Sequence, residues 1–258
     1  PSRHQTVAIL AQAQAASLCS RMISRRRLQC LRRCLAVQQQ TRAAQFDSRA
    51  ATYETPAKVA RAKMVAEEIR RRPWFRTGLA GLDFGAGTGL LTLELAPSFR
   101  HITGYDVSPK MLQVMEEKCR RRSDVAVAAA TGPVEALPRF DLIVSLLAFH
   151  HIRDVPGLVK QLGRQNLNPG GRLLIVDLEA TPNVRKFHKP QDRIGEDYEH
   201  DGFTQAAIRS WFVDDFGQLD YVQRPLLKKI AEGWSGAGEH EEFQLFFASA
   251  VKTGCQLW

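Results

Sequence analysis

The sequence has no long hydrophobic run and few cysteines, and both absences exclude classes of protein. Among its 258 residues, no apolar run approaches the roughly 20 residues that a membrane span needs. Its five cysteines form no Cys-x-x-Cys pair and no Cys/His cluster with zinc spacing. An odd number of cysteines without such motifs favours free thiols in a reducing compartment. We therefore expect no membrane span, no disulfide framework and no metal site.

Acidic residues are missing from the first part of the chain, and this uneven distribution changes the meaning of the net charge of +9. Residues 1–46 contain eight arginines and no Asp, Glu or Lys, so they carry +8. The other 212 residues, with 28 basic and 27 acidic side chains, carry +1. Binding to a phosphate backbone needs a basic face on the folded body. The composition therefore disfavours nucleic acid as a partner.

The acid-free, Arg-rich and Ala/Gln-rich composition of residues 1–46 is typical of a mitochondrial transit peptide. A presequence beginning at Met22 is also consistent with the pattern, and the alternative is a basic tail without a targeting role. No apolar core of the length that a secretory signal requires is present. We expect residues 1–44 to be a disordered or targeting segment and residues 45–258 to be the folded domain, in the mitochondrial matrix or the cytoplasm.

From about residue 79, apolar strand-like runs alternate with helical patterns. The expected strands are 79–84, 101–106, 125–130, 140–147 and 172–178, and the expected helices are 88–96, 109 onward and 154–167. Ser108 is suited to cap the second of these helices, and Pro109 fits its first turn. The strands are continuously apolar, which indicates burial on both faces of a parallel sheet. The fold class is therefore α/β, with a doubly wound sheet.

The regular alternation ends after residue 178. Residues 179–203 are polar and contain two prolines, and we expect them to form a lid-like excursion near the mouth of the sheet. A helix over 204–216 follows, and then strands 219–223 and 242–252, which should be antiparallel because no helix separates them. Residues 50–72 are expected to form one amphipathic helix before the sheet.

A glycine-rich loop follows the first expected strand, where open α/β sheets bind ligands. Gly85, Gly87 and Gly89 give the pattern G-x-G-x-G, with Leu90 where a dinucleotide fingerprint has its third glycine. Asp106 ends the next strand, 17 residues after Gly89, and a carboxylate at that point can accept hydrogen bonds from both ribose hydroxyls. The pattern predicts a cofactor that contains adenosine.

Several segments resemble the motifs of class I S-adenosylmethionine-dependent methyltransferases that act on small molecules. The similar segments are LDFGAGTGLLTLELA, GYDVSPKMLQVM, FDSRAATYE (46–54), EHDGFTQAAIRSWFVDDFG and the stretch from FDLIVSLLAFHH to LLIVDLE. The resemblance covers about residues 45–252. It implies a Rossmann-like sheet of seven strands with the last strand antiparallel, an N-terminal helical extension and S-adenosyl-L-methionine as the cofactor.

The resemblance also assigns roles to individual residues of the cofactor site. It places the three glycines under the methionine part of the cofactor, Asp83 near its ammonium, Asp106 on the ribose and Val107 against the adenine. Leu146 would line the cofactor from the fourth strand. Tyr53 would close over the cofactor carboxylate.

One stretch departs from the family pattern. The family often has an Asp that contacts the adenine amino group, and Pro133 stands at that position in TGPVEALP. Adenine recognition must then depend on the backbone of Val134, on Glu135 or on no equivalent group. A relative that binds the cofactor without catalysis is therefore an alternative.

Two histidines are the candidates for catalysis. His150 and His151 end the fourth strand, where an imidazole can take a proton from an acceptor near neutral pH. His188 and His200 lie in the 179–203 excursion and are candidates for contact with the acceptor.

The expected reaction is methyl transfer to a small molecule by in-line displacement, with methylation of protein or RNA as the alternative. The motifs of DNA amino-methyltransferases and of cytosine carbon-5 methyltransferases are absent, and so is the Tyr-x-x-x-Lys pair of a nicotinamide-dependent oxidoreductase. Neither the acceptor atom nor the oligomeric state follows from the sequence.

Overall fold

The computed structural model describes residues 42–192, 194–195, 197–229 and 240–254. Contacts divide the chain into two units, Pro1–Ala44 and Gln45–Trp258. Residues 1–41 lie outside the described residues, so the interpretation of the N-terminal segment and of the cellular compartment stays a prediction.

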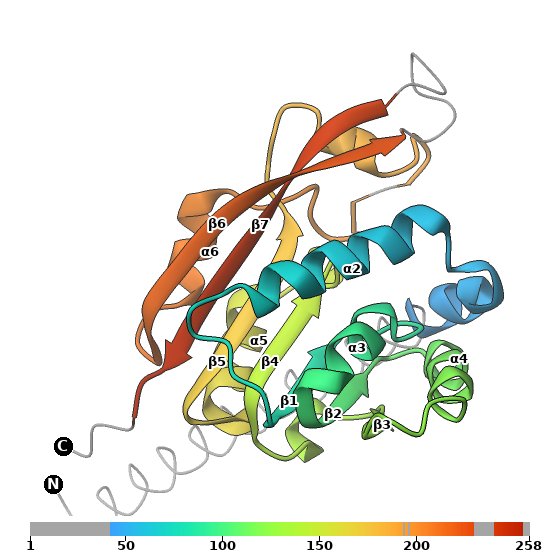
Figure 1. Cartoon of the computed structure of the whole chain (residues 1–258). Helices are drawn as coiled ribbons and strands as arrows, with labels where there is room; N and C mark the ends of the chain where they lie inside the picture. Colours follow the sequence, from blue (N-terminus) through green and yellow to red (C-terminus); the bar gives the residue numbers. More distant parts are fainter. Residues whose placement is uncertain (1–41, 193, 196, 230–239, 255–258) are drawn as a thin grey trace, which may run out of the picture. The chain divides into compact units, whose positions relative to one another are not determined.

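Seven strands form one sheet in the order β3-β2-β1-β4-β5-β7-β6 (Figure 1). Neighbours among the first five strands pair in parallel, and β7 is antiparallel to both β5 and β6. The strands are β1 Leu79–Phe84, β2 Phe99–Tyr105, β3 Val127–Ala130, β4 Phe140–Leu146, β5 Leu167–Leu178, β6 Phe216–Lys229 and β7 His240–Lys252. The Rossmann-like sheet with an antiparallel last strand is thus confirmed.

Helices cover both faces of this sheet (Figure 1). They are α2 Pro56–Arg70, α3 Leu90–Leu95, α4 Pro109–Cys119, α5 Val155–Gln161 and α6 Gln205–Trp211, and residues 42–49 are also helical. Shorter turns of 3-10 helix span Ala50–Thr52, Ala96–Ser98, Val134–Ala136, Phe149–His151 and Val184–Phe187. The apolar faces of α2 and α3 share one core cluster with the sheet, and α5 and α6 share another.

The central strands are buried on both faces, as their continuous apolar sequence predicts. In β4, Leu142 and Val144 pack in the cluster with α2, whereas Ile143 packs in the cluster with α5. All three side chains are at most 1% exposed. Complete burial of one such side chain stabilises the fold by about 1.5–3 kcal/mol, so the sheet provides a rigid base for the loops at its carboxyl edge.

The helices expected over 50–72 and 154–167 differ in extent from the helices of the structure. The single helix expected over 50–72 is interrupted, because α2 starts at Pro56 with the Thr55 side chain accepting a hydrogen bond from the Lys58 amide at 3.3 Å. A proline disfavours helical backbone in the residue before it, which separates α2 from the turn at Ala50–Thr52. The helix expected over 154–167 ends at Gln161 and continues as a π-helical turn, Leu162–Asn166.

The strand predictions are correct in number and too short at the C-terminal end of the chain. β6 runs over 14 residues instead of the five expected, because it pairs along its length with the 13-residue β7. The expected helix over 204–216 is shorter, at Gln205–Trp211, with Thr204 as its cap.

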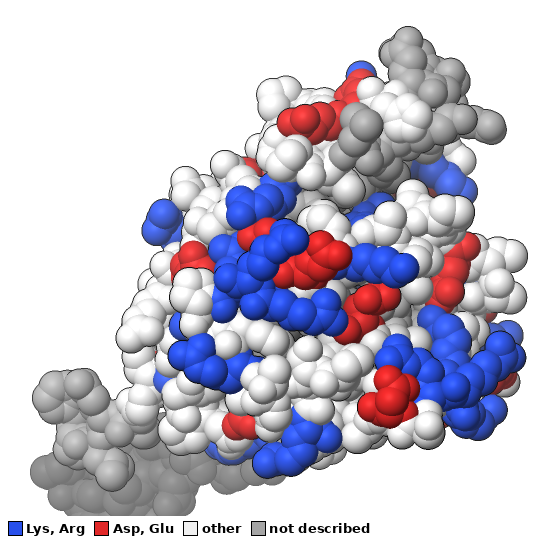
Figure 2. All heavy atoms as spheres, viewed as in Figure 1, with Lys and Arg blue, Asp and Glu red and all other residues white. Residues whose placement is uncertain are grey.

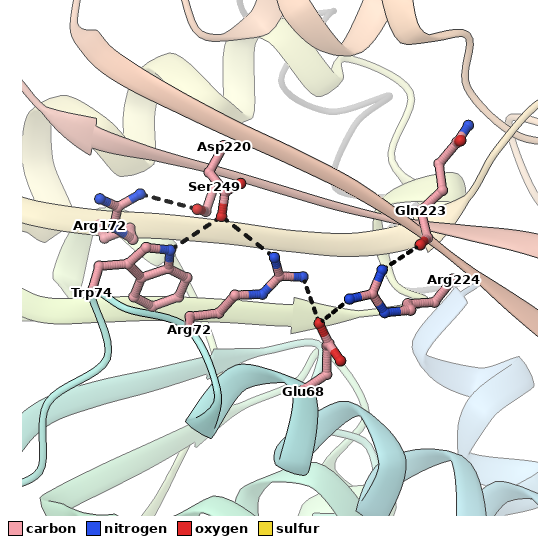
Figure 3. A network of polar contacts seen from close by, with 8 residues as sticks. All are labelled: Glu68, Arg72, Trp74, Arg172, Asp220, Gln223, Arg224 and Ser249. Atoms are coloured by element: carbon pink, nitrogen blue, oxygen red, sulfur yellow. Dashed lines mark hydrogen bonds and ion pairs between the residues drawn. The ribbon is translucent and has the colours of Figure 1, made fainter.

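A network of polar side chains fastens the C-terminal end of α2 and the residues just after it to β6 (Figure 3). Glu68 forms ion pairs with Arg72 at 3.1 Å and with Arg224 of β6 at 2.7 Å. Arg72 also pairs with Asp220 at 3.6 Å, and the Trp74 indole donates to the same carboxylate at 3.3 Å. The side chains of Arg72 and Glu68 are only 9% and 12% exposed, so this end of α2 is held by partly buried charges.

Candidate active site

The loop after β1 has a left-handed backbone at each of its three glycines, with φ of 77° at Gly85, 55° at Gly87 and 79° at Gly89. Residues with a Cβ adopt this conformation only with strain. A Cβ on Gly85 would lie 2.3 Å from the Cβ of Ala148, and a Cβ on Gly89 would lie 2.3 Å from the Cγ of Met115. The first and third glycines therefore allow the β4 loop and α4 to approach.

The middle glycine is linked to the predicted ribose acid. Asp106 follows β2, and its two carboxylate oxygens accept hydrogen bonds from the amides of Gly87 at 2.8 Å and Ser108 at 2.9 Å. Burial raises the pKa of Asp106, and the amide hydrogen bonds oppose that rise. A Cβ on Gly87 would have one atom within 4 Å, Cε1 of Tyr53 at 3.8 Å. The Tyr53 ring is therefore the nearest group on that side of the loop backbone.

Asp83 lies on β1 and is 1% exposed. Its Oδ2 accepts a hydrogen bond from the hydroxyl of Thr92 at 2.7 Å. Burial raises the pKa of Asp83 to about 7, against the lowering effect of the Thr92 hydrogen bond. Because a cation beside this carboxyl would favour its charged form, Asp83 is suited to hold an ammonium group.

A small cavity of about 60 Å³ lies between the glycine loop, α2 and the end of β4. It brings together five of the predicted cofactor residues, Tyr53, Asp83, Gly85, Gly87 and Leu146. Gly89, Asp106, Val107 and Val134 are not part of its lining. A separate open hollow of about 490 Å³ lies against Glu54 and the first turns of α2 and contains none of the predicted residues.

Two cations beside Tyr53 were not predicted from the sequence. The Lys58 ammonium lies 3.5 Å from the centre of the Tyr53 ring and donates to the Tyr53 carbonyl at 2.8 Å. Burial, with the positive charges of Arg61 and Arg49, lowers the pKa of Lys58 to about 8. The Nε of Arg61 is buried, and no described residue accepts a hydrogen bond from it. Both side chains line the cavity, so a positive potential faces its interior.

The segment before Tyr53 is fixed to two parts of the site. Asp47 accepts hydrogen bonds from the Ser108 hydroxyl at 2.5 Å and from the Lys110 amide at 3.1 Å. The Phe46 ring meets the His151 ring edge to face, with centres 5.3 Å apart. The N-terminal segment thus spans from the start of α4 to the predicted catalytic turn.

The predicted catalytic histidines lie in the turn Phe149–His151, just after β4. Leu147 precedes this turn with a φ of 53°, which is unusual for a residue with a side chain. His150 is 3% exposed, and its Nδ1 lies 2.7 Å from Oδ1 of Asp177. His151 has its Nδ1 3.2 Å from the carbonyl oxygen of Asp197.

Asp177 is the main site residue that sequence reasoning missed. It lies near the end of β5, beside β4, and is 0% exposed. A single acid inside the apolar run RLLIVDL was the available signal, because a carboxylate in such a strand needs partners.

The 179–203 segment lies against the histidine turn. The His150 carbonyl accepts hydrogen bonds from the amides of Glu199 at 2.9 Å and His200 at 3.1 Å. His188 stacks on the Tyr198 ring at 3.7 Å, and its own ring centre is 5.5 Å from that of His150. The imidazole of His200 instead contacts the Ile152 carbonyl at 2.9 Å. The imidazole of His188 therefore lies close to that of His150, whereas His200 contacts the turn through its backbone amide.

The predicted adenine side lies at the carboxyl end of β3. Pro133 is exposed, with φ of −65°, and it caps the turn Val134–Ala136. The Val134 carbonyl accepts a hydrogen bond from Asn166 at 3.1 Å, whereas its amide makes no hydrogen bond to another described residue. Glu135 is exposed. Two of the groups named for adenine recognition are therefore accessible.

Charges of both signs are interspersed on the face that carries α2 (Figure 2). Lys and Arg gather over α4, where Lys118 pairs with Glu54 and Arg122 with Asp124. Within the described ranges, no helix is long and apolar enough to cross a membrane. The same part of the chain contains no group of three His, Cys, Asp or Glu side chains arranged to hold a metal ion.

Comparisons with known proteins agree with this geometry. The model of a methyltransferase domain family matches residues 56–232. An uncharacterised methyltransferase of Schizosaccharomyces pombe is 31% identical over 152 residues, which cover 54% of this chain and 53% of that protein. The demethylmenaquinone methyltransferase of Tropheryma whipplei is 31% identical over 114 residues, 44% of this chain and 46% of that protein. The chain thus spans about half the length of the curated relatives it matches.

The solved structure of the YcgJ protein from Bacillus subtilis has the same fold. Its TM-score is 0.57 at 16% sequence identity, over 75% of this chain and 98% of that chain. The family match extends from the start of α2 through all of β6, so it includes the glycine loop, Asp106 and the histidine turn. The chain belongs to the class I S-adenosylmethionine-dependent methyltransferases, as a member of the methyltransferase domain family.

Proposed function

We propose that the protein transfers a methyl group from S-adenosylmethionine to a small-molecule acceptor that loses a proton in the reaction. The observation that carries the proposal is that two sets of groups lie at the carboxyl ends of neighbouring strands, β1 and β2 for one set and β4 and β5 for the other. The glycine loop, Asp83 and Asp106 form one set, and the buried His150 with its carboxylate partner forms the other.

The chain's own residues fit the cofactor. The buried Nε of Arg61 and the ammonium of Lys58 suit the carboxylate of its amino-acid part, and Asp83 suits its ammonium. Asp106 would hold the ribose, and the free Val134 amide would hold the adenine. When bound, the cofactor supplies an electrophilic methyl group on a sulfonium.

The remaining catalytic tasks fall to positioned side chains. An enzyme of this kind must align the acceptor with the methyl group and exclude water, and such alignment supplies much of the rate enhancement. The 46–54 segment and the 179–203 segment both contact the histidine turn and therefore enclose it. His150 would take the proton of the acceptor. His151, which these two segments contact, would form part of the wall of the acceptor site.

The enclosed turn favours a small acceptor over a macromolecule. The 179–203 segment donates to the His150 carbonyl, so a protein or RNA would have to displace it to reach the imidazole. Away from the basic cluster over α4, acidic side chains lie among the basic ones on the face shown in Figure 2, which disfavours RNA there. We regard 179–203 as the lid of the acceptor site.

The first experiment is a calorimetric titration of the full chain with S-adenosylmethionine and, separately, with NADH. We expect micromolar binding of the sulfonium cofactor and its loss in Asp106→Ala. Binding of NADH in its place would refute the assignment.

A screen with radioactive methyl groups then tests the acceptor class. Transfer to small molecules bearing hydroxyl, thiol or amine groups would support the proposal. Transfer confined to protein or RNA would contradict it. Tight cofactor binding without transfer to any acceptor would identify a non-catalytic relative, as Pro133 suggests.

A further inference from the structure

Asp177 holds His150 at two points. Its Oδ1 lies 2.7 Å from the Nδ1 of the imidazole, and its Oδ2 accepts a hydrogen bond from the His150 amide at 3.1 Å. The same Oδ1 also accepts from the Leu178 amide, at 2.8 Å. The carboxylate is 0% exposed, so these contacts are shielded from solvent.

The lid fixes His150 at a third point. The His150 carbonyl accepts from the amides of Glu199 and His200, at 2.9 and 3.1 Å. The amide, the carbonyl and the ring nitrogen of one residue are thus all held by elements distant in the chain. An imidazole with these constraints has little freedom to rotate.

The contacts of Asp177 select one tautomer of the imidazole. Two backbone amides donate to its oxygens, so the carboxylate acts as an acceptor, and the ring nitrogen beside it must carry a hydrogen. The lone pair then lies on Nε2. Among the described residues, Nε2 makes no hydrogen bond, so it is available to a ligand.

We propose that Asp177 is the positioning residue that makes Nε2 of His150 the proton acceptor of the reaction. This inference rests on the proposed function and specifies its acceptor: a molecule X–H whose proton must leave, such as a hydroxyl or an amine. The X–C bond forms while the carbon–sulfur bond breaks, and the electron pair of the broken bond stays on sulfur. The proton of X passes to Nε2, and the buried carboxylate stabilises the resulting imidazolium.

The first test is independent of catalysis. The nitrogen spectrum of full-length protein labelled with ¹⁵N-histidine distinguishes the two neutral tautomers, and His150→Gln identifies the His150 signals. We expect a hydrogen on Nδ1 and none on Nε2 in the unsubstituted protein. A hydrogen on Nε2 alone would overturn the inference, whether or not the protein binds the cofactor.

The second test uses matched asparagine substitutions. Asp177→Asn should lower kcat by about 100-fold or more, with the KM of the cofactor changed by about twofold at most, because it disturbs the base and leaves the glycine loop intact. The control is Asp141→Asn. Asp141 also accepts a hydrogen bond from a backbone amide, that of Ala80 at 2.9 Å. It lies near the amino end of β4, at the opposite end of the parallel strands from His150.

The outcomes separate this inference from the proposed function. An unchanged kcat in Asp177→Asn would refute the positioning role while leaving the enzyme assignment in place. Loss of kcat in Asp141→Asn as well would show a general effect of strand carboxylates and would also refute it. If no acceptor is ever methylated, the proposed function fails, and the tautomer measured by nitrogen spectroscopy still decides the role of Asp177.

Discussion

The two halves of the site are built in different ways. In the proposed cofactor half, Asp83, the glycine loop and Thr92 lie within ten residues of the chain, and Asp106 comes from the end of the next strand. Lys58 and Arg61 join them from α2. In the proposed acceptor half, Phe46 contacts His151 and Asp177 contacts His150, although the three segments are far apart in sequence.

This difference teaches where each half can tolerate change. The cofactor half depends on backbone conformation, so a single methyl group can disrupt it. The acceptor half depends on side-chain partners, so it can lose its chemistry while the fold and the cofactor site stay intact. The predictions below separate the two halves, from the largest expected effect to the smallest.

His150→Gln should break the acceptor half alone. Without a base, kcat should fall by about 10²–10⁴-fold, while the Kd of the cofactor, measured by calorimetry, stays the same. His101→Gln is the control, because His101 is exposed on β2 and contacts neither half. A cofactor affinity that falls together with kcat would contradict the separation of the halves.

Gly89→Ala should break the cofactor half through the fold itself. The new Cβ adds a clash with Met115 to the left-handed strain, and we expect a loss of about 3 kcal/mol in the free energy of unfolding. Gly78→Ala is the matched control, since Gly78 has a φ of 77° with no atom within 4 Å of the added Cβ. Gly78→Ala should lower the free energy of unfolding by about 1 kcal/mol. Equal losses in urea denaturation would show that packing at Gly89 is unimportant.

Cofactor affinity should fall as the pH falls through the pKa of Asp83, which is about 7. An ammonium prefers the ionised carboxylate, so affinity should drop by about 20-fold between pH 7.5 and pH 5.5. Asp83→Asn should bind more weakly and lose this pH dependence. A dependence that persists in Asp83→Asn would assign it to another group.

The same carboxyl makes an opposite prediction for the protein without cofactor. Its folded-state pKa is raised from 3.8, so the folded chain holds a proton that the unfolded chain releases. Its contribution to stability is present at low pH and is lost as the pH rises from about 4 through about 7. Chemical denaturation at several pH values should show a flatter profile for Asp83→Asn.

The smallest effect is expected at the adenine side. Pro133→Asp restores the acid that family members often have at this exposed position, and one added hydrogen bond stabilises the complex by about 1 kcal/mol. The Kd of the cofactor should therefore improve by about fivefold, with no change in kcat. An unchanged Kd would indicate that adenine does not lie beside residue 133.

Sequence reasoning predicted residues of the proposed cofactor half because its signals are local. A strand, a glycine loop and an acid at the end of the next strand follow one another, and parallel pairing of β1 with β2 brings them together. Arg61 escaped notice because one arginine in an amphipathic helix carries no signal of its own. Only the packing of α2 over the loop makes it part of the site.

The acceptor half could be predicted only in fragments. The position of His150 after β4 was evident, but its link to Asp177 depends on the pairing of β4 with β5 across 27 residues. The contact of the lid with the His150 carbonyl depends on tertiary structure and leaves no sequence pattern. For the same reason β6 was predicted too short, since its length is set by its partner strand.

The polar network of Figure 3 has a mechanical consequence for the site. It fixes only one end of α2, a helix of 15 residues and therefore about 22 Å long. A tilt of about 5° around that end would move the other end, near Tyr53, by about 2 Å. The cavity of about 60 Å³ is lined by Lys58, Arg61 and Ala62 of α2, so such a movement would change its volume. We therefore expect α2 to tilt around its C-terminal end, which is fixed to β6. Hydrogen exchange should then be faster at the Val59 amide, near the N-terminal end of α2, than at the Ile69 amide.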